Sequence, residues 1–189
     1  MKALRILFVG AAMALAVPQI ATAQAPAPAA VPEQTQTFIY KGVWGLRVPA
    51  GWQWNSDLSF PYLANGPEAA ATMERGTPIP PGGIAIGIFP QDLLPALGLI
   101  YTPLAGELAA SLAAWLGGAI DLVPLGGTPE PAFTTSLVGS AAAPPHSHLV
   151  VYQTGGASFA MLVVTEDFPA AADTIRAMIA STVVLGTIP

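Results

Sequence analysis

The stretch HSHLVVYQTGGASFAMLVVTE, residues 146–166, decides the fold. Two apolar runs flank Gly155-Gly156, and two consecutive glycines accept the positive φ that a two-residue hairpin turn requires. Both runs are apolar on both faces, so we expect them at the centre of a covered sheet. The turn predicts three facing pairs, which are Tyr152 with Phe159, Val150 with Met161, and His148 with Val163.

Further strands are expected on the N-terminal side of this hairpin. Residues 84–89 alternate isoleucine with small residues, which indicates a strand that another element approaches closely. Irregular structure is expected at 55–68 and at 91–102. Alternation of period two and the flanking turn residues predict the remaining strands at 37–41, 44–48, 52–54, 70–75 and 132–140.

Two helices are predicted from apolar spacing. The first covers 104–120, and a membrane span is the alternative for this stretch. The second helix begins at Asp167 and Pro169, a cap followed by a first-turn proline. The order of strands, a helix, a three-strand meander and a final helix is α+β, an antiparallel β-sheet with helices packed on it. The buried stripe of the first helix is expected to contain Leu104, Leu108, Leu112, Trp115 and Leu116. The buried stripe of the second helix is expected to contain Ile175, Met178, Ile179 and Thr182.

The N-terminus has the pattern of a secretory signal peptide over 1–23. Positive charge at Lys2 and Arg5 precedes an apolar run at 6–17, and small residues precede a cleavage site after Ala23. The run is too short for a bilayer about 30 Å thick, although an uncleaved anchor is the alternative. A Pro/Ala-rich linker at 24–36 and one domain at 37–189 follow. We therefore expect a soluble domain that is periplasmic or secreted and has no transmembrane anchor after cleavage.

Composition restricts the partners and the chemistry. The chain has no cysteine, which excludes disulfides, a lipid-anchoring cysteine and thiolate metal sites. The predicted signal holds two of the six basic residues and none of the eleven acidic ones, so the remainder has a net charge of −7. Four cations are too few to neutralise a phosphate backbone, so nucleic acid is excluded as a partner.

Residues 46–52, Leu-Arg-Val-Pro-Ala-Gly-Trp, form a strand that turns through Pro-x-Gly-Trp and resemble the opening of PsbP-like domains. The hairpin strand at 159–164 and the helix through 175–181 are also similar, and the resemblance spans nearly all of 37–185. It implies a compact α-β-α sandwich. Members of this family act mostly by binding, as extrinsic photosystem subunits, a Ran-binding import factor or exported bacterial proteins. They share no catalytic residues, so the resemblance implies none here.

Two groups of residues are candidates for a site. Trp44, Trp52 and Trp54 could line an aromatic ligand cleft or a partner surface, or they could be core residues. His146 and His148, two apart on a predicted strand, could be two ligands of zinc, nickel or copper, or a solvated strand end. No motif supplies a third metal ligand, and no cofactor is expected.

Catalytic motifs such as G-x-S-x-G, S-x-x-K, H-E-x-x-H and a Walker loop are absent. Glu166, Asp167 and Asp173 could act as an acid–base group, or as charges that favour a helix start. We therefore expect a non-catalytic exported domain that binds or stabilises an envelope protein. The alternative is a small-molecule or lipid carrier with an apolar cleft between the sheet, residues 104–120 and the tryptophans. A third hypothesis is a hydrolase that uses His146 or His148.

Overall fold

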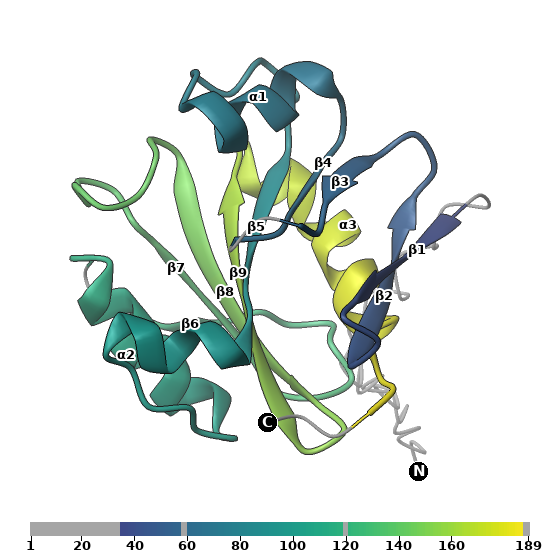
Figure 1. Ribbon diagram of the computed structural model, residues 1–189. Coiled ribbons are helices and arrows are strands. Elements are labelled where there is room, and N and C mark those ends of the chain that lie inside the picture. Colours follow the sequence, from purple (N-terminus) through teal and green to yellow (C-terminus); the bar gives the residue numbers. More distant parts are fainter. Residues whose placement is uncertain (1–34, 58–59, 119–120, 187–189) are drawn as a thin grey trace, which may run out of the picture.

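The computed structural model describes residues 35–57, 60–118 and 121–186 (Figure 1). The predicted signal peptide at 1–23 and the linker up to residue 34 lie outside the described residues. The first strand, β1, begins at Thr35, within the stretch that was expected to be linker. No helix in the described ranges is long and apolar enough to cross a membrane.

The central hairpin has the register that the sequence predicts. Strand β8 (Ser147–Thr154) pairs antiparallel with β9 (Ala157–Val164), and Gly155 and Gly156 form the turn with φ of +57° and +77°. All three predicted facing pairs are present. β9 is buried along its whole length and β8 along most of it, as expected for central strands.

The hairpin is the centre of a seven-stranded antiparallel sheet in the described part of the chain, with the order β3-β4-β5-β9-β8-β7-β6. The fold class, α+β with antiparallel sheets and helices packed on them, is therefore confirmed. The other strands of this main sheet are β3 (Gln53–Asn55), β4 (Tyr62–Ala64), β5 (Ala85–Phe89), β6 (Val123–Pro124) and β7 (Ala132–Ser136).

One face of the main sheet carries helices α1 (Pro67–Arg75) and α2 (Ala105–Trp115). Leu108, Leu112 and Leu116 of the predicted stripe are buried, and they pack with Leu149, Val151 and Leu162 of β8 and β9. These sheet residues alternate with others that face the opposite layer, because side chains of a strand point alternately to its two faces.

The opposite face carries helix α3 (Phe168–Ala180) and a three-stranded sheet, here called the small sheet. Its strands are β1 (Thr35–Tyr40), β2 (Trp44–Pro49) and β10 (Val183–Val184), in the order β1-β2-β10. α3 starts as predicted, since the Asp167 carboxylate accepts a hydrogen bond from the Ala170 N–H at 3.0 Å. The molecule thus has three layers, with the main sheet in the middle (Figure 1).

Several local predictions were wrong. Residues 70–75 belong to helix α1 and not to a strand, because Pro67 starts the helix, alanines continue it and left-handed Gly76 ends it. The region 55–68 contains β4, and 91–102 contains a 3₁₀ helix, η1 (Gln91–Leu97). α2 is shorter than predicted, since Leu116 and left-handed Gly117 follow its last residue. β7 ends at Ser136 and not at residue 140.

Candidate functional site

The three tryptophans of the predicted cleft do not form one. Trp44 is 2% exposed and lies between Phe38 and Phe159, with ring centroids 5.8 and 5.3 Å away. It joins the small sheet to the main sheet. Trp52 is also buried in this core, whereas Trp54 is 37% exposed and meets Phe38 edge-on. Of these three tryptophans, Trp54 alone therefore offers an accessible indole.

The two histidines do not lie together on a strand as predicted. β8 begins at Ser147, and His146 precedes it in the left-handed region with φ of +61°. His148 stacks on Phe168 with the ring centroids 4.3 Å apart, and burial together with the nearby His146 lowers its pKa. In the described ranges, no three His, Cys, Asp or Glu side chains form a group that could hold a metal ion. His148 therefore packs the start of β8 against α3, whereas His146 is exposed.

The C-terminal carboxylates have structural partners. Asp167 caps α3, and Asp173 pairs with Arg176 one turn later at 2.6 Å. Glu166 is exposed beside the cap. This arrangement matches the helix-start interpretation of these charges.

An apolar pocket lies where α1 and α2 meet the main sheet, and we call it the aromatic pocket. Its volume is about 240 Å³. Phe89 of β5 stands between Phe60 and Trp115 and meets both edge-on, with centroids 5.4 and 6.4 Å apart. The lining consists of Phe60, Thr72, Met73, Gly87, Phe89, Trp115, Leu116, Ala142, Pro144 and Leu162.

The glycine in β5 makes room for this pocket. A Cβ on Gly87 would lie only 2.7 Å from the terminal methyl of Met73, which reaches over the strand from α1. The close approach that the alternating sequence at 84–89 predicted is therefore made by Met73. Thr72 is the polar side chain of the lining, and its hydroxyl donates to the Pro78 carbonyl at 3.5 Å.

Sequence reasoning missed these aromatic residues. Trp115 was predicted to be part of the buried stripe of α2, but it is 41% exposed because Leu108, Leu112 and Leu116 already form the buried side. The predicted apolar stripe is wider than the buried side of the helix, and this excess width is a signal in the sequence that one of its residues is exposed. Phe60 lies in a stretch predicted to be irregular, and no pattern links it to Phe89.

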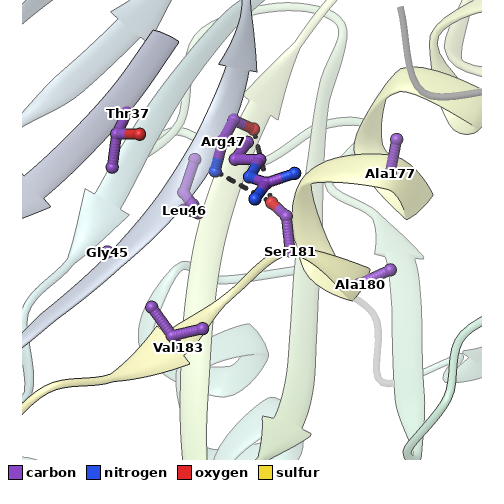
Figure 2. A pocket seen from close by; sticks show the side chains of 8 residues that line it. All are labelled: Thr37, Gly45, Leu46, Arg47, Ala177, Ala180, Ser181 and Val183. Carbon is purple, nitrogen blue, oxygen red and sulfur yellow. Dashed lines mark hydrogen bonds between the residues drawn. The ribbon is translucent and has the colours of Figure 1, made fainter. Parts of the chain in front are cut away.

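A second hollow lies between β2 and the last turn of α3, and we call it the outer groove (Figure 2). Its volume is about 530 Å³. The hydroxyl of Ser181 accepts a hydrogen bond from the Arg47 N–H at 2.8 Å and also lies 3.5 Å from the Arg47 carbonyl. The lining consists of Thr37, Gly45, Leu46, Arg47, Ala177, Ala180, Ser181 and Val183.

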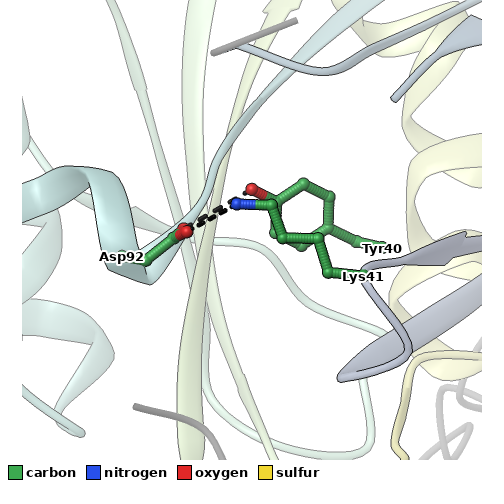
Figure 3. A network of polar contacts seen from close by, with 3 residues as sticks. All are labelled: Tyr40, Lys41 and Asp92. Atoms are coloured by element: carbon green, nitrogen blue, oxygen red, sulfur yellow. Dashed lines mark hydrogen bonds and ion pairs between the residues drawn. The ribbon is translucent and has the colours of Figure 1, made fainter. Parts of the chain in front are cut away.

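A charged contact links the small sheet to η1 (Figure 3). Lys41 follows β1 in the left-handed region, and its ammonium lies 2.7 Å from the Asp92 carboxylate and 5.0 Å from the centre of the Tyr40 ring. The hydrogen bond to Asp92 raises the pKa of Lys41. The pair is exposed to solvent, so it orients the hairpin more than it stabilises the fold.

Neither the protein-family models nor the curated proteins include a match to this chain.

Proposed function

We propose that this chain is an exported, non-catalytic binding domain that holds an apolar side chain of an envelope protein in the aromatic pocket. The observation that carries the proposal is the row of Phe60, Phe89 and Trp115, in which the two outer rings are partly exposed. Exposed aromatic rings beside a hollow are typical anchors of protein interfaces. Export is supported by the charge, apolar run and small residues at 1–23.

The size of the pocket favours a side chain over a whole ligand. Pockets that enclose drug-sized molecules have volumes of about 300–1,000 Å³. The aromatic pocket, at about 240 Å³, is below that range and has room for one leucine- or phenylalanine-sized group. Rings that meet edge-on can accept a further ring at their exposed edges.

The second candidate is a carrier of a small apolar molecule. It is favoured by the position of the aromatic pocket between the main sheet and α2, where the sequence predicted a carrier's cleft. The tryptophan in that pocket is Trp115, and not Trp44, Trp52 or Trp54. The hydrolase hypothesis gains no support from His148, whose ring packs on Phe168.

We also propose that this chain is related to PsbP-like domains. Helices on both faces of an antiparallel sheet, and a Pro-x-Gly-Trp turn after β2, support it. Gly51 of that turn has φ of +83°, a conformation that glycine adopts without strain.

The test is affinity capture of tagged mature protein from cross-linked envelopes, compared with Gly87→Ala. The new methyl pushes the flexible Met73 side chain aside and narrows the pocket, while alanine is tolerated in a strand at least as well as glycine. We expect one enriched protein whose recovery falls at least fivefold with Gly87→Ala. Equal recovery with both proteins would contradict the proposal, and a lipid in place of a protein would favour the carrier.

A further inference from the structure

We propose that the outer groove is a second binding site, separate from the aromatic pocket, which takes an extended acidic peptide of a partner protein. Arg47 binds a carboxylate of the peptide, and the hollow above Gly45 takes an apolar side chain. The site lies on the outer side of the small sheet, so it is on the other side of the main sheet from α1 and α2.

Arg47 carries a positive charge that is not paired within the described residues. Each of the other three cations in the described ranges has an ion-pair partner, since Lys41 pairs with Asp92, Arg75 with Glu74 and Arg176 with Asp173. Arg47 is exposed, and no described carboxylate pairs with its guanidinium. Arg47 is therefore the cation of the described ranges that remains available to an acidic ligand.

The position of Arg47 is held by α3. The Ser181 hydroxyl accepts a hydrogen bond from the Arg47 N–H at 2.8 Å, and the side chain of Arg47 reaches toward the end of the helix (Figure 2). The C-terminus of a helix carries a partial negative charge of about half a unit, which attracts the guanidinium without neutralising it. The planar guanidinium can bind a carboxylate in a two-point contact.

Exposed apolar side chains flank Gly45. In the register of the small sheet this glycine faces Ile39 on β1 and Val183 on β10, which are 51% and 50% exposed. A Cβ on Gly45 would lie 2.8 Å from the Phe38 carbonyl oxygen and 3.4 Å from the Ile39 side chain, so this glycine allows β1 and β2 to approach closely and forms a flat part of the groove lining. Ala177 and Ala180 on α3 are also small, which keeps the groove open on that side.

The spacing of these features selects the ligand. Gly45 and Arg47 lie two residues apart on one face of β2, a separation of about 7 Å. An extended peptide presents alternate side chains at the same spacing, so an apolar residue followed two positions later by Glu or Asp matches both features. The groove, at about 530 Å³, has room for more than one side chain of such a peptide.

The test is fluorescence anisotropy with the labelled peptide Gly-Thr-Val-Thr-Glu-Thr-Gly and a second peptide in which Gln replaces Glu. We expect the wild-type protein to bind the Glu peptide about tenfold more tightly than the Gln peptide. Arg47→Gln should remove that difference. Arg75→Gln is the matched control, because it removes an exposed cation elsewhere and should leave the tenfold ratio intact.

Further variants keep the test decisive. Val183→Thr, which has nearly the same shape, should weaken binding of both peptides about fourfold, since it removes one methyl from the apolar contact. Gly87→Ala should change neither affinity, so failure of the aromatic pocket and failure of the outer groove can be distinguished. Equal affinity for the two peptides, or equal losses with Arg47→Gln and Arg75→Gln, would overturn the proposal. Sedimentation that shows a dimer while neither peptide binds would also overturn it, in favour of a contact between copies of this chain.

Discussion

The buried hydrogen bond between Tyr152 and Thr182 gives a quantitative test of how β10 is held in place. The two hydroxyl oxygens are 3.1 Å apart, and Tyr152 is fully buried in β8. Thr182 donates its own proton to the Met178 carbonyl at 3.2 Å, so it accepts from Tyr152. The bond connects the main sheet to the residue that directly precedes β10, and thus to Val183 in the outer groove.

The two single substitutions should differ in cost. Tyr152→Phe removes one bond but leaves the Thr182 hydroxyl with a partner, so it should lower the free energy of unfolding by about 1 kcal/mol. Thr182→Val leaves the buried Tyr152 hydroxyl without a partner, which should cost about 2 kcal/mol. The Met178 carbonyl is not orphaned in either case, because it also accepts from the Ser181 hydroxyl at 2.8 Å.

The double variant makes the prediction specific. With both hydroxyl groups gone no polar group is left unsatisfied, so the total loss should be about 1 kcal/mol, well below the combined loss of the single variants. Urea unfolding followed by tryptophan fluorescence measures all four proteins, with unchanged m-values as the control for an intact fold. Additive losses in the double variant would refute this account of the bond.

Three further predictions concern titration and capping. Burial raises the pKa of Tyr62 from 10.0 to about 12 and also raises the pKa of Tyr152. The fold should therefore lose stability as the pH rises above 10. In a titration followed by phenolate absorbance, part of the rise should occur above the ordinary tyrosine pKa, and Tyr62→Phe should reduce that part. The pKa of His148 is lowered, so the folded state resists protonation of this side chain and the urea midpoint should fall as the pH drops below 6.5. His148→Asn should make the urea midpoint less dependent on pH. An equal slope of urea midpoint against pH in the two proteins would contradict this prediction. Asp167→Ala removes the hydrogen-bond acceptor of the Ala170 N–H and should lower the free energy of unfolding by about 1 kcal/mol in urea titrations at neutral pH. An unchanged free energy of unfolding would contradict a stabilising role of this cap.

The parts of the fold that were predictable are those specified by local patterns. The β8–β9 register follows from the two glycines of the turn, and α3 follows from Asp167 and Pro169. α1 was mistaken for a strand because its alanines have no strong apolar period, and its burial depends on the sheet beneath it. Strands of three residues, such as β4, are set by pairing with β5 and leave no pattern of their own.

The candidate sites were harder to predict than the fold. The aromatic pocket unites Phe60, Phe89 and Trp115, which come from three separate segments. The outer groove depends on the pairing of β2 with β10, and that contact joins distant parts of the chain. In both cases the residues were visible in the sequence, but their proximity is a property of the tertiary structure.

The most direct test of the proposed function is photocrosslinking from inside the aromatic pocket. Ala142 lines the pocket and is exposed, so p-benzoyl-phenylalanine in its place can report what occupies the site in intact envelopes. We predict one crosslinked protein, identified by mass spectrometry, whose yield falls at least fivefold when Gly87→Ala is added. Crosslinks to lipid or to a small molecule, or a protein crosslink that Gly87→Ala does not change, would contradict the conclusion that this pocket holds a side chain of a partner protein.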